Sequence, residues 1–207
     1  MKVLVKAQVV MSNSAKKLIL ASTSVYRREL LERLRIPFTV VSPKVDETPL
    51  PSESTVDLAL RLAKAKAAAV AKDYPDAWVI GSDQVADLCG AAIGKPGNFE
   101  RAMAQLQLMR GSSVTFNTAL CLMHGDTETT VNIPTEVKFR KLSDDVLEAY
   151  LIAEEPYDCA GSAKSEGLGI SLLEAIKSDD PTALIGLPLI ALSGLLRDAG
   201  FEIPPKK

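Results

Sequence analysis

The chain has 207 residues, of which 47% are apolar and 24% charged, and its formal net charge is -2 at pH 7. This length and composition suit one compact domain or two lobes that share a core, and they exclude general disorder. The near-neutral charge argues against broad binding to nucleic acid or to an anionic membrane, although a nucleotide needs only a local cluster of Lys and Arg.

Cysteine and histidine are too few for a disulfide framework or a zinc site. Cys89, Cys121 and Cys159 are widely spaced, and His124, beside a turn and expected at the surface, is the only histidine. Any bound metal would therefore be a hard cation on carboxylate and phosphate oxygens. No apolar run reaches the roughly 18 residues of a membrane helix, and no cleavage site follows the short apolar start. We therefore expect a cytoplasmic protein without membrane contact.

The first half of the chain alternates strands and helices. Residues 17–22 form an apolar run typical of a buried strand, and Ser24 can cap a helix whose leucines follow at helical spacing. Pro37 ends this helix, and a second strand is predicted at 38–42. A polar, proline-rich loop leads to the strongest predicted helix, at 54–74, which is apolar on one face and rich in lysine on the other.

The second half combines strands, helices and one long hairpin. In order, the sequence predicts a strand at 77–88, a helix at 98–109, an antiparallel hairpin turning at 124–126, a helix at 143–154, a short strand ending at Lys177 and a helix at 187–199. The interleaved order indicates an α/β fold, and the hairpin makes the sheet mixed rather than all parallel. Residues 1–16 are treated as an N-terminal extension without an assigned function, because a folded domain would naturally begin near Met11.

Five short patterns contain residue types that can carry chemistry: ASTSVYRR at 21–28, VDE at 45–47, RLAKAKA at 61–67, GSDQV at 81–85 and GKP at 94–96. The first joins a strand end to a helix N-terminus, where amides, hydroxyls and arginines can bind an anion. The paired acids of the second can coordinate magnesium or manganese. For the first three patterns, a capped helix or a solvated surface is the alternative interpretation.

The lysines and the acid in these patterns differ in their expected exposure. Lys64 and Lys66 stand two residues apart and cannot share one helix face, so we expect one to point to a site and the other to water. Asp83 is an acid at the end of an apolar strand, a position that often borders the ligand crevice of α/β folds. No Walker A loop, dinucleotide fingerprint or GxSxG elbow is present. Taken alone, these residues indicate an α/β protein with a phosphate and metal site.

Taken together and in order, these segments resemble the Maf family. The matching pieces are LILASTSVYRRELL, VDET, RLAKAKA, IGSDQV, GKP, CAGSAKSEGLG and LIGLPL, and the resemblance runs from about Lys17 to Ala199. It implies an elongated α/β fold like that of inosine triphosphate pyrophosphatases, with a mixed twisted sheet, flanking helices and two lobes around a cleft, as a single catalytic domain over 17–207. It also implies hydrolysis of a nucleoside triphosphate to the monophosphate and pyrophosphate, with a divalent metal.

The resemblance assigns roles by motif position. Asp83 takes the role of proton acceptor or metal-proximal acid, and Glu47 joins it as a candidate ligand of a divalent cation, magnesium or manganese. The phosphate-binding positions are Ser22, Arg27, Lys66 and Lys95. Positive charges of this kind neutralise a leaving pyrophosphate, and a carboxylate can orient or deprotonate the attacking water. Which carboxylate holds the metal and which activates water stays open.

Three further positions resemble the branch of the family that hydrolyses 7-methyl-GTP: Tyr26, Gln84 and Glu166. The branch that acts on dTTP and UTP usually carries Arg, Thr and Gln there. The 7-methylguanine ring is cationic, so Tyr26 can stack on it by cation–π attraction, while Glu166 can accept hydrogen bonds from the guanine N–H edge. Tyr26 stands where Trp is familiar, and Val25 where Pro is common. The resemblance thus implies a 7-methyl-GTP pyrophosphatase that removes modified nucleotides from the pool.

Two alternatives stay open at this point. One is a dTTP/UTP pyrophosphatase, and the other is a nucleotide-binding regulator, since Maf proteins are linked to septum formation and cell division. Asp83, Glu47 and the two lysines favour catalysis, because a pure binder has no need of an acid that activates water. The expected partner is a small-molecule nucleotide, without nucleic acid or membrane, and a homodimer is left open.

Overall fold

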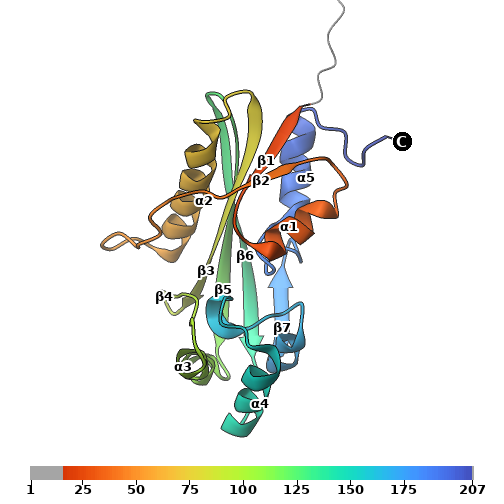
Figure 1. The fold of residues 1–207 in the computed structure, drawn as a ribbon. Helices are drawn as coiled ribbons and strands as arrows, with labels where there is room; N and C mark the ends of the chain where they lie inside the picture. The colour runs from red at the N-terminus through yellow and green to blue at the C-terminus, as the bar shows by residue number, and fades with distance from the viewer. Residues whose placement is uncertain (1–15, 207) are drawn as a thin grey trace, which may run out of the picture.

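The computed structural model describes residues 16–206 and consists of one sheet with helices on both faces (Figure 1). The strands are β1 (Lys17–Ala21), β2 (Thr39–Val41), β3 (Ala77–Leu88), β4 (Ala91–Ile93), β5 (Ser113–His124), β6 (Thr127–Phe139) and β7 (Leu173–Ser178). The helices are α1 (Val25–Glu32), α2 (Thr55–Ala71), α3 (Phe99–Met109), α4 (Asp144–Glu154) and α5 (Leu189–Asp198), with 3-10 turns η1 (Ala160–Ser162) and η2 (Leu168–Leu172).

The sheet is mixed, as the sequence predicts. Its order is β2-β1-β3-β5-β6-β7, and β4 pairs with β3 beside this path. β1 runs parallel to β2 and β3, whereas every other paired strand is antiparallel. The expected hairpin is formed by β5 and β6, paired from Ser113↔Lys138 to His124↔Thr127. Residues 1–15 of the predicted N-terminal extension lie outside the described residues.

The helices begin where their capping residues predict. The side chains of Ser24, Ser54 and Asn98 each accept a hydrogen bond from a backbone N–H of the first turn of α1, α2 and α3. Ser143 occupies the N-cap position of α4 but makes no side-chain capping bond. The last helix is shorter than the predicted 187–199, since α5 begins after an N-cap at Pro188.

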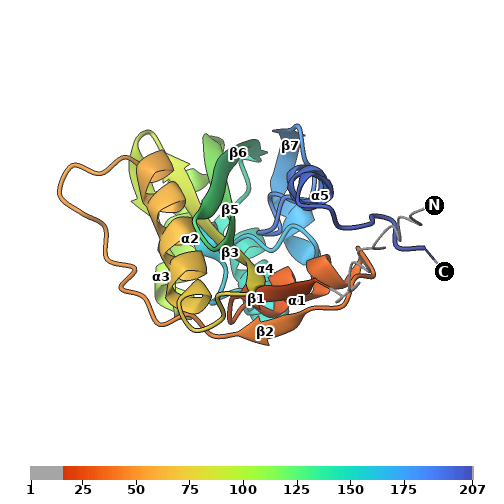
Figure 2. The same ribbon diagram turned by 90° about the horizontal axis from the view of Figure 1, so that it is seen from above.

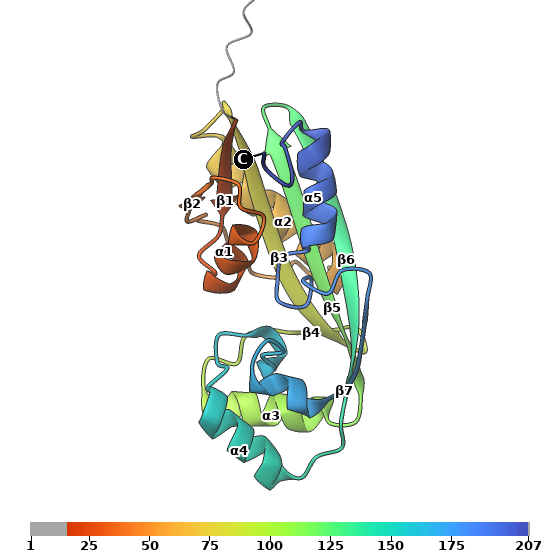
Figure 3. The ribbon, with the colours of Figure 1, turned by 90° about the vertical axis from the view of Figure 1, so that its right-hand side faces the viewer.

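The core is divided among three clusters, which give the molecule two lobes (Figure 3). One cluster lies between α2 and the sheet, and a second lies on the opposite face, under α1 and α5 (Figure 2). The third packs α3 and α4 against the far ends of β3, β5 and β6. The long strands thus run through both lobes. No helix within 16–206 has the length and apolar character needed to cross a membrane.

Helix α2 lies unusually close to the backbone of β3. A Cβ atom at Gly81 would stand 2.1 Å from the carbonyl oxygen of Ala63 and 2.6 Å from the backbone nitrogen of Ala67, so no other residue fits there. This close approach puts Lys66, one turn along the same face of α2, over Asp83 of β3. The packing of the helix therefore fixes the relative position of two charged side chains.

Among residues 16–206, no strand pairs with one edge of β3 in the middle of the strand. β1 pairs with β3 only as far as Gly81, and β4 pairs with it only from Ala86 onward. On this edge, Ser82 to Val85 have neither β1 nor β4 beside them, while β5 covers the opposite edge throughout. Asp83 lies in this gap. The description of Asp83 as a strand-end acid was wrong: it lies in the middle of β3, which has the predicted bounds 77–88, and it is the neighbouring strand β1 that stops.

His124 also differs from its prediction as a surface residue. It is half-buried at the end of β5, where its ring stacks on Trp78 with the centroids 4.7 Å apart. Trp78 in turn makes an edge-on contact with Phe201. The contact depends on the register of β3 against β5, which local sequence does not reveal.

Candidate active site

A cavity of about 610 Å³ opens at the uncovered edge of β3. Its walls come from both lobes: the segment after β1, the loop before α2, α2 itself, β3, the segment after β4 and the loops at 158–166 and 184–186. Every residue to which the family resemblance gives a role lines this cavity: Ser22, Tyr26, Arg27, Glu47, Lys66, Asp83, Gln84, Lys95 and Glu166. Their roles remain predictions, but the fold brings them to one place.

A buried ion cluster stands at the centre of the cavity wall. Lys66 Nζ donates to Asp83 Oδ1 at 2.6 Å and lies 2.7 Å from Glu47 Oε1. The side chains of Lys66 and Asp83 are 8% and 10% exposed, whereas that of Glu47 is 58% exposed. One ammonium therefore bridges a buried carboxylate and a carboxylate at the rim. Lys64 points to water instead and pairs with Glu128 at 2.9 Å, so the predicted division between the two lysines is confirmed.

Arg27 is oriented toward this cluster by a main-chain acceptor. Its Nε donates to the carbonyl oxygen of Gly186 at 2.8 Å, and Ser82 Oγ donates to the same oxygen at 3.0 Å. Gly186 has φ +115°, a conformation that favours glycine. Burial lowers the pKa of Arg27, and the charges of Asp83 and Glu47 oppose that shift. The guanidinium stays charged, with its terminal nitrogens available for an anion.

Glu47 is held in its ionised form. Burial raises its pKa, but the hydrogen bond and charge of Lys66, with the charges of Lys95 and Arg27, outweigh burial and leave the pKa below its usual value. Lys95 itself is exposed on the segment after β4. We call the group of Ser22, Arg27, Glu47, Lys66, Asp83 and Lys95 the phosphate end of the cavity, after the role that the resemblance predicts for it.

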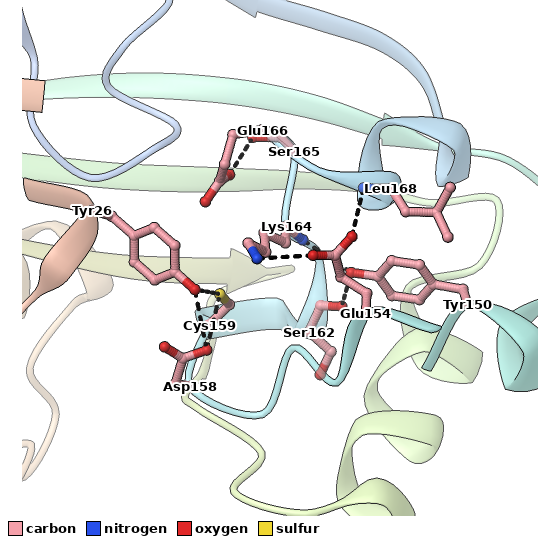
Figure 4. Close-up of polar contacts among 10 residues, drawn as sticks. All are labelled: Tyr26, Tyr150, Glu154, Asp158, Cys159, Ser162, Lys164, Ser165, Glu166 and Leu168. Carbon is pink, nitrogen blue, oxygen red and sulfur yellow. Dashed lines mark hydrogen bonds and ion pairs between the residues drawn. The ribbon is translucent and has the colours of Figure 1, made fainter. Parts of the chain in front are cut away.

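A second group of residues that line the cavity has an aromatic ring and carboxylates (Figure 4). Tyr26 OH lies 3.5 Å from Asp158 Oδ1 and 3.9 Å from Cys159 Sγ. Burial, together with Cys159, Asp158 and Glu166, raises the pKa of Tyr26, so the phenol is neutral. Burial and Asp158 raise the pKa of Cys159 to about 12, which leaves a thiol rather than a nucleophilic thiolate. We call Tyr26, Asp158, Cys159 and Glu166 the base end.

Gln84 joins the cavity wall to the loop before α5. Its Nε2 donates to Thr118 Oγ1 and to the carbonyl oxygens of Ala183 and Leu184, each at 3.0 Å. These bonds fix the loop that also supplies the Gly186 carbonyl. Gln84 therefore helps to hold the cavity wall in place, in addition to the specificity role that the resemblance implies.

Several residues of the site were not predicted from the sequence. Asp158 and Cys159 could have been suspected, because they directly precede the AGSAKSEG segment. The carbonyl oxygen of Gly186 could not, since a main-chain acceptor leaves no mark in residue types. The buried Asp180, which does not line the cavity, was also missed: its carboxylate accepts bonds from Thr182 and from the first turn of α5 and so holds the loop.

The carboxylates at the phosphate end fit a hard divalent cation only in company with a substrate. Among residues 16–206, no group of three His, Cys, Asp or Glu side chains is placed to hold a metal ion. Glu47 and Asp83 offer two carboxylates separated by one ammonium. Magnesium is commonly bound by one or two carboxylates, with phosphate oxygens and waters completing the octahedron. The donor set suits that arrangement.

Comparisons with known proteins show the family of this chain. The Maf family, described as Maf-like protein, matches residues 17–199. A protein of Cupriavidus metallidurans named 7-methyl-GTP pyrophosphatase is 60% identical over 192 residues, covering 92% of this chain and 96% of its own. A protein of Burkholderia thailandensis with the same name is 61% identical over 198 residues, covering 93% of this chain and 92% of its own. One of Bordetella pertussis, also so named, is 59% identical over 186 residues, covering 90% and 94%.

Among solved structures, a HAM1 protein from Coxiella burnetii superposes partially. The TM-score is 0.41 at 15% sequence identity, over 61% of this chain and 74% of the other. The family match spans most of the described residues, including both ends of the cavity. This chain belongs to the Maf family.

Proposed function

We propose that this protein hydrolyses 7-methyl-GTP to 7-methyl-GMP and pyrophosphate. One observation carries the proposal: a single cavity is lined both by the cations Arg27, Lys66 and Lys95 and by an aromatic ring beside carboxylates. A 7-methylguanosine triphosphate has a matching distribution of charge, with an anionic tail and a cationic base. The names of the relatives, each about 60% identical, support the same substrate.

At the phosphate end, Arg27 and Lys95 neutralise the negative charge of the triphosphate. They also stabilise the negative charge that develops on the leaving pyrophosphate. Asp83 Oδ1 accepts the bond from Lys66, and we assign the attacking water to its other oxygen. The water oxygen bonds to phosphorus, the bridge between the α- and β-phosphates breaks, and Asp83 receives the proton. Lys66 stabilises the carboxylate while the water is being oriented.

We propose magnesium or manganese as the cofactor, held by Glu47 and Asp83. When bound, such a cation would draw negative charge from the phosphate oxygens. Glu47 suits this role because its pKa is kept low by Lys66 against the effect of burial, so it presents a charged oxygen at the cavity rim. Loss of turnover in EDTA, restored by magnesium or manganese, is the expected result, and full activity in EDTA would remove the metal from the proposal.

At the base end, Tyr26 offers a π face and Glu166 an acceptor for the guanine N–H edge. Both line the cavity, although they come from α1 of one lobe and from the loop after α4 in the other. A positively charged ring gains from each of them, whereas neutral guanine gains less. The selection of the base thus depends on the charges at the base end, and the hydrolysis depends on the residues at the phosphate end.

The test is pyrophosphate release from 7-methyl-GTP, GTP, dTTP and UTP, with Asp83→Asn as the inactive control. We expect the highest kcat/KM for 7-methyl-GTP. Faster hydrolysis of dTTP or UTP would overturn the choice of base and leave the pyrophosphatase reaction standing. Binding of nucleotides without any turnover would instead favour the regulator of septum formation.

The proposal extends to the surroundings of the enzyme. Its partner is a small-molecule nucleotide rather than a nucleic acid, consistent with a net charge of -2. Its place of action is the cytoplasm, where a nucleotide pool would be cleared. A homodimer is left for sedimentation measurements to decide.

A further inference from the structure

The segment that carries Glu166 is held by a residue outside the cavity, Glu154 at the end of α4 (Figure 4). Glu154 Oε1 pairs with Lys164 Nζ at 2.8 Å, and its Oε2 accepts a hydrogen bond from the backbone N–H of Leu168 at 2.7 Å. A Cβ at Gly167 would lie 2.7 Å from Glu154 Oε2, so the glycine lets the segment approach the carboxylate closely. Glu154 therefore bonds both ends of a segment with Glu166 at its centre.

The ammonium in this ion pair stands near both groups that we assign to the base. Lys164 Nζ lies 5.8 Å from the centroid of the Tyr26 ring, near the outer limit of a cation–π contact. Its charge also acts on Glu166, where burial raises the pKa and Lys164 opposes the rise. A lysine free to move closer would compete with a cationic base for the ring and for the carboxylate.

We propose that Glu154 is a positioning residue for base selection: by holding the Lys164 ammonium in an ion pair, it keeps the Tyr26 ring and the Glu166 carboxylate available to a cationic base. The inference rests on the function proposed above. Neither Glu154 nor Lys164 is among the residues that line the cavity, so Glu154 acts through its neighbour rather than by touching substrate.

The ion pair is well suited to restrain the lysine. The side chains of Glu154 and Lys164 are 16% and 27% exposed, so water screens the pair less than it screens a fully exposed one. The neighbouring backbone is fixed as well, because Tyr150 OH accepts from the backbone N–H of Lys164 and donates to the carbonyl oxygen of Ser162. With its backbone held on α4 and its charge held by Glu154, Lys164 has little freedom to reach Glu166.

A purely mechanical role for the pair makes a different prediction. If Glu154 only tied the segment down, its replacement would disturb Glu166 whether or not the lysine was present. If it restrains a competing charge, removal of that charge from the same protein restores selectivity. The double variant Glu154→Gln/Lys164→Met therefore separates the two roles, because it lacks the ion pair and the free ammonium together.

The experiment measures kcat and KM for 7-methyl-GTP and GTP in Glu154→Gln, Lys164→Met and the double variant. Glu148→Gln, an exposed residue of α4, is the matched control for loss of one carboxylate. We expect Glu154→Gln to raise KM for 7-methyl-GTP about tenfold, with little change in kcat or in KM for GTP, since one charge-assisted contact is lost. Lys164→Met should keep the preference, and the double variant should recover it to within about twofold.

A readout without turnover accompanies the kinetics. Carbon-13 NMR titration should show a lower pKa for Glu166 in Glu154→Gln, because the charge of Glu154, which raises this pKa, is lost and the released ammonium approaches. The double variant should show no such fall, because the ammonium, which lowers this pKa, is removed as well. Unchanged selectivity in Glu154→Gln, or a double variant as impaired as the single one, would overturn the proposal. Should Glu154→Gln fail to fold, Lys164→Met decides, and a lost preference there overturns it. A wild-type enzyme without preference for 7-methyl-GTP would instead refute the proposed function, while the titration would still test the restraint of Lys164.

Discussion

The buried ion pair at the phosphate end and the exposed carboxylates at the base end lie on different kinds of backbone. At the phosphate end, Lys66 comes from the middle of α2 and Asp83 from the middle of β3, and Gly81 lets these two elements pack backbone against backbone. At the base end, Asp158 and Glu166 come from the loop and 3-10 turns after α4. Regular elements thus hold the buried pair of Lys66 and Asp83, and a loop supplies Asp158 and Glu166.

The charged residues at the two ends of the cavity also differ in burial. Lys66 and Asp83 are 7% exposed as whole residues, whereas Asp158 and Glu166 are exposed. A charge pair removed from water is costly to break, but a loop carboxylate can change with little effect on the fold. The contrast suggests how one scaffold can keep its reaction while its choice of base is altered. Changes at the phosphate end should therefore affect every substrate, and changes at the base end should affect one.

The largest effect is expected from Asp83→Asn. The substitution removes the assigned proton acceptor and keeps the shape of the side chain, so kcat should fall by about 10²–10⁴-fold for every nucleotide. Pyrophosphate release measures the loss, and circular dichroism checks the fold, because Lys66 loses its buried ionic partner and keeps the more exposed Glu47. Near wild-type turnover in a folded Asp83→Asn protein would remove this residue from the mechanism.

Loss of a phosphate-binding cation comes next. Arg27→Ala and Lys95→Ala should each lower kcat/KM by about 10–100-fold for all nucleotides tested, since one charge-assisted contact to the triphosphate disappears. Lys64→Ala is the matched control, because this lysine pairs with Glu128 outside the cavity. A loss confined to one base would show that the altered residue belongs to the base end.

Glu166→Gln should have a smaller effect, on selectivity alone. The amide keeps the shape but loses the charge, so the preference for 7-methyl-GTP over GTP should fall about tenfold while kcat changes little. Tyr26→Ala should raise KM for the methylated substrate in the same way, since the π face is removed. Equal losses on 7-methyl-GTP and GTP would indicate that these residues do not read the charge of the base.

The smallest effect on selectivity is expected from a lower pH. Burial raises the pKa of Glu166, so its carboxylate takes up a proton at a higher pH than an exposed glutamate does. The preference for a cationic base is present above this raised pKa and is lost as the pH falls through it. The ratio of kcat/KM for 7-methyl-GTP and GTP should therefore drop a few-fold between about pH 7 and about pH 4.5, around the range of a glutamate. In Glu166→Gln the ratio should stay flat, and an equal drop in both proteins would assign the effect elsewhere.

The elements themselves were largely readable from the sequence. The predicted strand at 77–88 has the bounds of β3, and the hairpin turns where predicted, because turn residues and alternating apolar residues are local signals. The strand order was not readable. Nor was the gap beside Asp83, since it depends on β1 stopping at Ala21 while β3 continues.

The candidate site was likewise predicted in part from the sequence. The family resemblance, carried by residue types and motif order, predicted site roles for Arg27, Glu47, Lys66, Asp83 and Lys95. Spacing along the helix predicted that Lys64 and Lys66 point in different directions. The carbonyl oxygen of Gly186 and the carboxylate of Glu154 could not be found this way. The carbonyl oxygen of Gly186 contacts Arg27 from a distant part of the chain, and Glu154 bonds Leu168 across the loop that follows α4.

The sequence by itself determined which local segments form and which charges are present, because capping, periodicity and turn chemistry act over a few neighbouring residues. Only the tertiary structure decided which charges meet. Tyr26 and Glu166 line one cavity, and Lys66 lies between Glu47 and Asp83, because the long strands carry both lobes and α2 packs onto Gly81. Side-chain contacts of this kind depend on strand register and helix packing, which the whole core fixes at once.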